Sequence, residues 1–538
     1  MQNMKILGKK GHAPKKIRVL EGINPTLWLI FILLFALTLR LTFFVGMGFN
    51  DDSSYLGYAE QIVRKGAYIP HGGSAWETRI GAYIPVSIVW KLIGIGELSA
   101  SLYFLTLSVG SVWVTYLLAK EFFNEKTSLT ASFLLATFPL DIVYSTQIGP
   151  DIPFQFFIAS ATLFFIKNEK HSSRVCGLLS GLFLGLAYIT KSAVALLLPV
   201  LIFYILMQII FQKKNISSYF KKKVVVSYSL IAICFLLIFT SQVFYFYLLT
   251  GEWFFGEKTR QKFYTNDRNS NPDLYLYPNY MFNFDFMGLN FDFEYFQWIH
   301  DVPLFGFIYY FVLISMTYLI LRKDMPSMFF MFWLVFFFFF FECGLQFYCT
   351  EIMDYCLYGK SLRFLSTISI PAVILVARFL ESGSGGIIRV FSVLGLLFLT
   401  VTSISCAYQS SVFLGNGMGD VRETAQFIYG SLPRTIYLPD QWCVSKIKFF
   451  FRYNKTYTQN LKVYHCAVID CNNEYFNKGQ HISDAYVVTW LNPYTWTNRD
   501  YPEFMRNPPE NWKLLKTIKL KNYGIFEKYD PKIYYVPP

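Results

Sequence analysis

Two adjacent carboxylates stand in the stretch Phe49-Asn50-Asp51-Asp52-Ser53-Ser54-Tyr55, which follows the first long apolar run of the chain. Over residues 54–65, apolar side chains recur with the spacing of an amphipathic helix, and Gly66 predicts where that helix ends. Asp51 and Asp52 are therefore expected at the helix N-terminus, where unpaired backbone N–H groups and the helix dipole favour negative charge. A carboxylate kept ionised there suits a general base or a cation ligand. The alternative is that the pair only caps the helix.

The composition places most of the chain in lipid. Of its 538 residues, 54% are hydrophobic and only 15% are charged, and the mean hydropathy is +0.36. Soluble globular chains carry about 25% charged residues. The formal net charge of +13 lies mainly in short turns between apolar runs, which is typical of membrane-protein orientation signals and not of a nucleic-acid footprint. The nine Cys show no metal-ligand spacing, and we expect neither a metal nor a cofactor.

The apolar runs predict a polytopic α-helical membrane protein. Runs long enough to cross the hydrocarbon core begin near residue 25 and recur as far as residue 409. The amphipathic stretch 82–93 is expected to lie along the membrane interface instead. We place about eleven transmembrane helices, near residues 25–45, 98–119, 128–145, 151–167, 175–190, 192–211, 224–249, 303–321, 327–345, 362–380 and 388–409.

The basic turns between the spans predict the orientation of the chain. Residues 1–24 are rich in Lys and Arg, and with this count of spans the other basic turns fall on the same side. The positive-inside rule makes that side cytoplasmic. The N-terminus is then expected in the cytoplasm, and the loops 46–97 and 250–302 are expected outside.

The segment 410–538 is predicted to form a separate extracytoplasmic α/β domain. It combines a helical start at 421–429 with strand-like runs at 435–438 and 485–489, and its length suffices for a small core. The expected organisation is a cytoplasmic tail, a transmembrane domain and this outer domain, over residues 1–24, 25–409 and 410–538.

A third carboxylate joins the candidate site on the outer side. Asp151 lies in the tight turn Gly149-Pro150-Asp151-Ile152-Pro153 between two spans. A carboxylate at a membrane boundary is costly unless it is paired or used, so it is a functional candidate. The alternative is that Asp151 only caps the following span.

Three cations on the same side are candidates for binding a phosphate. Arg79, Lys191 and Arg363 each border an apolar run, where a charged-group hydrogen bond to a phosphate would lie at the lipid interface. The other basic residues of these loops, such as Arg260, are expected mostly to face solvent. No P-loop, dinucleotide fingerprint, HExxH or GxSxG motif is present. The acids and cations together favour a phosphate-linked lipid substrate.

An ordered set of short motifs resembles the GT-C membrane glycosyltransferases, in the branch that includes the protein O-mannosyltransferases and the lipid A aminoarabinose transferase. The resemblance covers residues 45–210 well and the remainder loosely, and it implies a GT-C fold. The aminoarabinose branch has a Lys followed by prolines where Thr78-Arg79-Ile80 stands here. The matching stretches are Asp51–Ala59, Arg79-Ile80-Gly81 with Pro85, Pro139, Asp151, Thr190-Lys191-Ser192, Arg363-Phe364-Leu365 with Pro371, and Asp420–Ala425.

The resemblance implies transfer of a single sugar, hexosyl or pentosyl, from a polyprenyl-phosphate carrier to an acceptor hydroxyl on the outer face of the membrane. The displacement would invert the anomeric carbon. Asp51 or Asp52, with Asp51 slightly favoured, would act as general base. Asp151 would position the acceptor or a basic neighbour, and Arg79, Lys191 or Arg363 would neutralise the leaving phosphate.

The resemblance also implies the setting of the reaction. The donor would be a polyprenyl-phosphate-linked sugar, and the acceptor a lipid, a glycan or a protein. The protein would belong to a bacterial or archaeal plasma membrane and serve cell-envelope glycosylation.

Three other functions stay open. A transporter or flippase of polyprenyl-linked sugars would show polar residues within the spans and an internal repeat. A glycan ligase or polymerase would use a diphosphate carrier, and a membrane scaffold would not need the Asp pair. The position of the acids at the outer ends of the spans favours the transferase.

Overall fold

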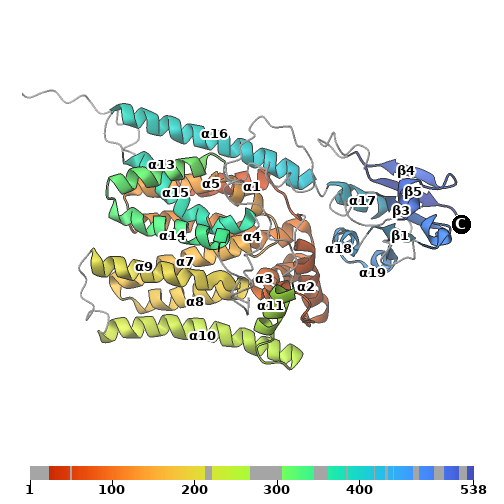
Figure 1. The fold of residues 1–538 in the computed structure, drawn as a ribbon, viewed down its shortest axis with the longest axis horizontal. Coiled ribbons are helices and arrows are strands. Elements are labelled where there is room, and N and C mark those ends of the chain that lie inside the picture. Colours follow the sequence, from red (N-terminus) through yellow and green to blue (C-terminus); the bar gives the residue numbers. More distant parts are fainter. Residues whose placement is uncertain are drawn as a thin grey trace, which may run out of the picture.

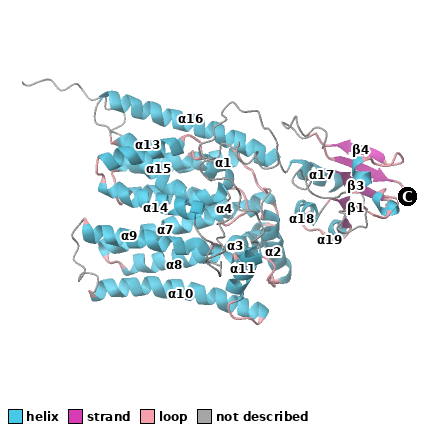
Figure 2. Cartoon of the chain, viewed as in Figure 1, coloured by secondary structure: helices cyan, strands magenta, loops and turns pink. Residues whose placement is uncertain are grey.

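The computed structural model describes a helical bundle followed by a smaller α/β unit (Figures 1 and 2). The N-terminal segment before residue 24, most of the loop 250–302, and Phe49 and Asn50 lie outside the described residues. The described residues are 24–48, 51–211, 221–266, 306–343, 362–382, 386–416, 419–429, 434–439, 441–464, 472–489, 502–519 and 530–538.

The bundle has a helix or pair of helices at each predicted span. The helices and short 3-10 turns are α1 Pro25–Thr42, α2 Asp52–Lys65, η1 Ala75–Thr78, α3 Ile80–Ile93, α4 Glu97–Lys120, α5 Glu125–Ala136, α6 Pro139–Tyr144, α7 Asp151–His171, α8 Arg174–Thr190, η2 Ser192–Leu196, α9 Leu197–Ile210, α10 Lys222–Thr250, α11 Phe255–Asn266, α13 Ile308–Leu321, α14 Met325–Cys343, η6 Leu362–Leu365, α15 Ser366–Glu381 and α16 Gly386–Asn416.

The lengths of these helices differ from the prediction in places. Within the described residues, six helical stretches are long and apolar enough to cross a membrane, and four shorter apolar helices accompany them. The stretch 128–145, expected as one span, is not one continuous helix, because α5 ends at Ala136 and α6 begins at Pro139. Proline disfavours helical backbone at the preceding residue and cannot donate to the preceding turn. The count of about eleven spans stays a prediction.

A stripe of glycines brings α8 and α10 together. Gly177, Gly181 and Gly185 recur at every fourth residue of α8. A Cβ at Gly181 would lie 2.4 Å from the carbonyl oxygen of Ile231, and one at Gly177 would lie 2.6 Å from that of Ser227. Only glycine allows two helix backbones this close, which is a common mode of packing between helices in lipid.

The basic turns gather at one end of the bundle. Lys167 and Lys170 of α7 pair with Glu121 at the end of α4. Arg378 of α15 pairs with Asp324 and covers the ring of Phe123. The ends of α2, α7 and α15 that carry the candidate site lie at the other end, next to the α/β unit (Figure 1).

The C-terminal unit contains a mixed five-stranded sheet in the order β2-β1-β3-β5-β4. β1 runs parallel to β2 and β3, whereas β5 is antiparallel to β3 and β4. β1 and β3 coincide with the strand-like runs of the sequence, and every residue of β3 is buried. The strands are β1 Thr435–Leu438, β2 Leu461–Val463, β3 Ala485–Thr489, β4 Lys513–Thr517 and β5 Lys532–Val536, and the helices are α17 Gly419–Tyr429, α18 Gln441–Phe450, α19 Lys455–Thr458, α20 Glu474–Asn477 and α21 Glu503–Arg506.

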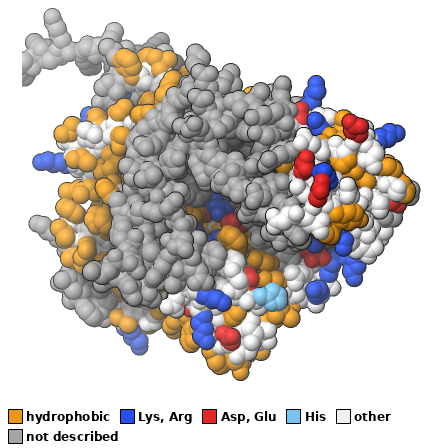
Figure 3. Space-filling view, turned by 45° about the vertical axis from the view of Figure 1, so that its right-hand side comes forward, with side chains coloured by type: hydrophobic (Ala, Val, Ile, Leu, Met, Phe, Trp, Pro, Cys, Tyr) orange, Lys and Arg blue, Asp and Glu red, His pale blue; other side chains and the backbone are white. Residues whose placement is uncertain are grey.

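The C-terminal unit packs on the bundle through α18, which lies against α2. Trp90 of α3 stacks on Phe449 with ring centroids 6.2 Å apart, and Arg64 of α2 donates to the carbonyl of Tyr453. Buried side chains of both parts form one hydrophobic cluster. Hydrophobic side chains are exposed on the described bundle helices. Acidic and basic side chains lie on the surface of the C-terminal unit, at the right of Figure 3.

Candidate active site

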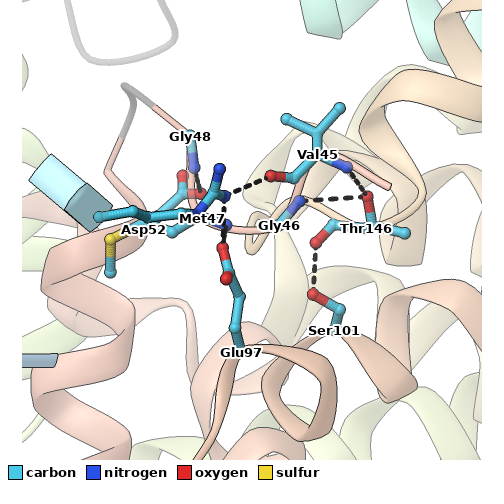
Figure 4. A network of polar contacts seen from close by, with 9 residues as sticks. Val45, Gly46, Met47, Gly48, Asp52, Glu97, Ser101 and Thr146 are labelled. Carbon is cyan, nitrogen blue, oxygen red and sulfur yellow. Dashed lines mark hydrogen bonds and ion pairs between the residues drawn. The ribbon is translucent and has the colours of Figure 1, made fainter. Parts of the chain in front are cut away.

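Asp51 and Asp52 lie at the start of α2, but neither carboxylate caps the helix. Asp51 is the N-cap residue, and its side chain makes no capping hydrogen bond. The Asp52 carboxylate accepts a 2.8 Å hydrogen bond from the backbone N–H of Gly48, in the segment before the helix (Figure 4). The helix begins at Asp52, two residues before the predicted start. The interpretation of the pair as simple capping residues therefore finds no support in these contacts.

A single arginine joins Asp51 to Asp151. The guanidinium of Arg363 lies 2.8 Å from the Asp51 carboxylate through Nη2 and 3.4 Å from the Asp151 carboxylate through Nε. The side chains of Arg363 and Asp51 are 12% and 14% exposed, so the pair is shielded but not sealed. Residues more than 300 positions apart thus form one charge-paired group.

Lys191 completes this group from the other side of Asp151. Its ammonium lies 2.8 Å from Asp151 Oδ1, and both side chains are almost fully buried. The same ammonium lies 3.6 Å from the ring centroid of Phe364, a cation–π contact. Asp151 is the first residue of α7, and Lys191 separates α8 from η2. Both charged residues therefore lie at helix ends, and neither interrupts a helix.

Arg79 lies beside this group and is held by a different partner. It follows η1 and donates a 2.8 Å hydrogen bond to the phenol oxygen of Tyr55, which belongs to α2. Burial raises the pKa of the Tyr55 phenol above its usual value, so the phenol stays protonated and neutral. All six predicted site residues are thus placed around the starts of α2 and α7, the end of α8, and the turns η1 and η6.

The two adjacent carboxylates differ in environment. Asp52 is almost completely buried, and this burial raises its pKa to about 6. The Gly48 N–H and the charges of Arg363 and Lys446 oppose that shift, while the neighbouring Asp51 adds to it. Asp51 keeps contact with solvent and has a charged side chain as its partner, whereas Asp52 has a backbone amide.

The structure corrects the expectation for Arg260 as a solvent-facing residue. Arg260 is only 4% exposed, because α11 carries it beneath the η1 turn. Its Nε donates to Thr78 Oγ1 at 2.9 Å, and its Nη1 lies 3.2 Å from Glu257. A cation of the long loop therefore contacts Thr78, the residue before Arg79, and no local pattern indicated its burial.

Two residues of the C-terminal unit also reach this region and were not predicted as site residues. Lys446 of α18 is buried and close enough to Asp52 for its charge to favour the ionised carboxylate. Arg422 of α17 pairs with Glu97 at 2.6 Å. The helical spacing of Cys443, Lys446 and Ile447 was the available signal for Lys446, because two of these three are apolar and share its face.

The described residues contain no group of three or more His, Cys, Asp and Glu side chains arranged to hold a metal ion. The arrangement instead consists of carboxylates neutralised by Arg and Lys. Such cations bind phosphate oxygens through charge-assisted hydrogen bonds. The chemistry available is therefore phosphate binding next to a partly exposed carboxylate.

Comparison with known proteins agrees with the resemblance predicted from the sequence. Residues 80–249 match the family model described as dolichyl-phosphate-mannose-protein mannosyltransferase. The chain is 31% identical over 201 residues to undecaprenyl phosphate-alpha-4-amino-4-deoxy-L-arabinose arabinosyl transferase 1 of Pseudomonas fluorescens, which covers 35% of this chain and 34% of that protein. The curated relatives are thus matched over little more than a third of their length.

Solved structures share the fold over most of the chain. ArnT from Cupriavidus metallidurans has a TM-score of 0.56 at 12% identity, covering 95% of this chain and 98% of that one. The same protein has also been solved bound to undecaprenyl phosphate. The oligosaccharyltransferase of Archaeoglobus fulgidus has a TM-score of 0.54 at 13% identity, covering 86% of this chain and 69% of that one. The predicted resemblance to the GT-C membrane glycosyltransferase superfamily is confirmed.

Proposed function

We propose that this multi-pass membrane protein transfers a single sugar from a polyprenyl-phosphate carrier to an acceptor hydroxyl. The observation that supports this most is the chain of contacts from Asp51 through Arg363 and Asp151 to Lys191. It sets a partly exposed carboxylate beside cations suited to a phosphate. The solved neighbour that holds undecaprenyl phosphate has the same fold.

The donor phosphate would bind to cations that carboxylates occupy in the free protein. Arg363 presents a planar fork of N–H donors, which matches two phosphate oxygens as well as it matches carboxylates. A phosphate at Arg363 would compete with Asp51 for the same Nη2 donor. Lys191 and Arg79 flank this position from α8 and η1. Binding of the donor would therefore release Asp51 from its ion pair.

Asp51, once released, would act as the general base. It would take the proton of the acceptor hydroxyl while the acceptor oxygen bonds to the anomeric carbon and the bond to the phosphate oxygen breaks. Attack on the face opposite the phosphate inverts the carbon, and Arg363 and Lys191 would neutralise the released phosphate. Asp52 is less suited to this role, because it is buried and bonded to the Gly48 N–H.

The basic end of the bundle supports an orientation for this proposal. The turns with Lys167, Lys170 and Arg378 lie together at the end remote from the candidate site. The positive-inside rule makes that end cytoplasmic. The site and the C-terminal unit would then face outward. The named relatives include both an arabinosyl transferase and mannosyl transferases, so hexosyl and pentosyl donors both fit this proposal.

The test compares Asp51→Asn with Asp52→Asn in the purified full-length protein. Transfer of radiolabelled sugar from polyprenyl-phosphate donors, one hexosyl and one pentosyl, into membrane lipid or glycan is measured for each. We expect Asp51→Asn to lose about 10²-fold or more, because an amide cannot accept the acceptor's proton. We expect Asp52→Asn to lose less, because its amide oxygen can still accept from Gly48. Full transfer by a folded Asp51→Asn protein would refute the role of Asp51.

A further inference from the structure

The segment that leads into Asp51 and Asp52 is held by a residue of the C-terminal unit. Arg422 of α17 donates through Nη2 to the carbonyl oxygen of Val45 at 2.8 Å. The same nitrogen pairs with Glu97 Oε1 at 2.6 Å. Figure 4 shows the segment Val45–Gly48 together with Glu97, one of the two acceptors. A residue more than 370 positions away in sequence thus contacts the segment that precedes α2.

Glu97 passes this contact on to the next residues of the segment. Its Oε1 also accepts the backbone N–H of Met47 at 2.8 Å. A Cβ at Gly46 would lie 2.2 Å from that oxygen, and the residue has a positive φ of 70°. Glycine is therefore required at this position for the carboxylate to approach the backbone.

The other side of the segment is fixed by the turn before α7. Thr146 accepts the N–H of Val45 through Oγ1 at 3.0 Å, and its own carbonyl accepts from Ser101 at 2.5 Å. The segment ends with Gly48, whose N–H donates to Asp52. The backbone of this segment is therefore hydrogen-bonded to Glu97 of α4, to Arg422 of α17 and to Asp52 of the candidate site itself.

We propose that Arg422 is a positioning residue, which fixes the segment Val45–Gly48 from the C-terminal unit and thereby the carboxylates of Asp51 and Asp52. This inference rests on the proposed function for its effect on transfer. The segment is itself neither helix nor strand, so its conformation depends on these side-chain contacts. A shift of about 1 Å in a reacting group can cost 10²-fold in rate. The C-terminal unit would then be part of the catalytic unit rather than an appended module.

The experiment replaces Arg422 by Gln and by Lys, with Arg434→Gln as a matched control. Arg434 also lies in the C-terminal unit and forms an ion pair, with Asp484 at 3.2 Å, but it does not contact the segment. Three quantities are measured: the hydrogen exchange of a peptide containing residues 45–48, the Kd for polyprenyl phosphate, and kcat for transfer. The exchange measurement needs no substrate, so it tests the contact even if the protein catalyses another reaction.

We expect Arg422→Gln to speed exchange at residues 45–48 and to lower kcat by about 10- to 100-fold. The Kd for polyprenyl phosphate should stay unchanged, because Arg79, Lys191 and Arg363 come from other elements. Arg422→Lys should recover part of both effects, since it keeps the charge facing Glu97. Arg434→Gln should match the parent protein. If Arg422→Gln does not fold, Glu97→Gln serves instead, because it removes the charge that pairs with Arg422 while its amide oxygen can still accept from Met47.

Unchanged exchange at residues 45–48 in the folded variants would overturn the proposal, whatever happens to kcat. Faster exchange with unchanged kcat would overturn it as well, because the segment would then move without consequence for transfer. Absence of transfer in the parent protein, combined with faster exchange in Arg422→Gln, would count against the proposed function and leave the structural contact established.

Discussion

Arg363 and Arg40 are two shielded arginines whose partners differ. At the end of the bundle next to the C-terminal unit, Arg363 pairs with the carboxylates of Asp51 and Asp151. Inside the bundle, Arg40 of α1 is fully buried and donates to Ser108 Oγ at 2.7 Å. Its Nη1 donates to the carbonyl oxygens of Ala36 and Ala136 at 3.1 Å each.

The difference shows what makes a buried cation available to a ligand. The carbonyl oxygen of Ala136 belongs to the last turn of α5, so Arg40 supplies a partner for the interrupted helix before Pro139. A backbone carbonyl is fixed and cannot be exchanged for a phosphate without loss of the helix end. The side-chain carboxylates at Arg363 can turn away when a stronger anion arrives. Exchangeable partners, and not burial alone, distinguish the candidate site.

The largest effect is expected from breaking the buried pair of Lys191 and Asp151. Lys191→Met leaves Asp151 with the longer contact to Arg363 alone, and losing one partner of a buried pair costs about 3–5 kcal/mol. The double variant Lys191→Met with Asp151→Asn removes both charges and should recover most of the lost stability. Thermal unfolding in detergent measures this.

The same pair of variants separates stability from function. Affinity for polyprenyl phosphate should stay weak in the double variant, because the lost cation is not replaced. A double variant that binds the donor as tightly as the parent protein would show that Lys191 serves folding only. Lys191 would then resemble Arg40, whose partners are structural.

The second effect concerns the two arginines directly. Arg363→Gln should lower transfer by about 10²–10³-fold, the usual cost of removing one donor that stabilises developing charge. Arg40→Gln, at a fully buried site, should change transfer by less than about tenfold while lowering the unfolding temperature. Rates of sugar transfer for the two purified variants, corrected for folded protein, provide the measurement. Equal losses in both would remove the distinction drawn between the two regions.

The smallest effect is expected at Asp52, which lies in the candidate site but accepts its hydrogen bond from a backbone N–H. Its pKa is raised from 3.8 to about 6, so the protonated form favours the folded state. This stabilisation is complete below pH of about 4 and is lost as pH rises through about 6, by at most about 3 kcal/mol. Asp52→Asn should therefore unfold at a higher temperature than the parent protein at pH 7.5.

The difference between Asp52→Asn and the parent protein should vanish near pH 4. Unfolding temperatures measured across this pH range test the prediction. A constant difference at every pH would mean that the carboxylate does not titrate between these limits.

Much of the fold could be predicted from the sequence, because apolar runs of sufficient length leave few alternatives. The break between Ala136 and Pro139 was missed because the run remains apolar across it. Part of the candidate site could also be predicted from the sequence, for a related reason. Asp51 and Asp151 are unusual residues at the ends of apolar runs, and charge at such a boundary is conspicuous in any sequence.

The contacts between distant elements could not be predicted. Lys446 and Arg422 reach the site only because α17 and α18 dock on the bundle, and docking depends on three-dimensional surfaces. Arg260 was missed for the same reason, since α11 buries it beneath η1. Local patterns report which face of a helix is apolar, but they do not report which element covers that face.

The glycine stripe of α8 separates insertion into the membrane from assembly within it. Lipid tails are as apolar as helix side chains, so α8 and α10 gain little from exchanging lipid for each other, and their association depends on close backbone contact. A bulky apolar residue at Gly181 would leave both helices as apolar as before, so we expect their predicted insertion into the membrane to be unchanged. Such a protein would be made and inserted in normal amounts, yet α10 would stand apart from the bundle. A quality-control system that recognises only failed insertion would not detect the fault.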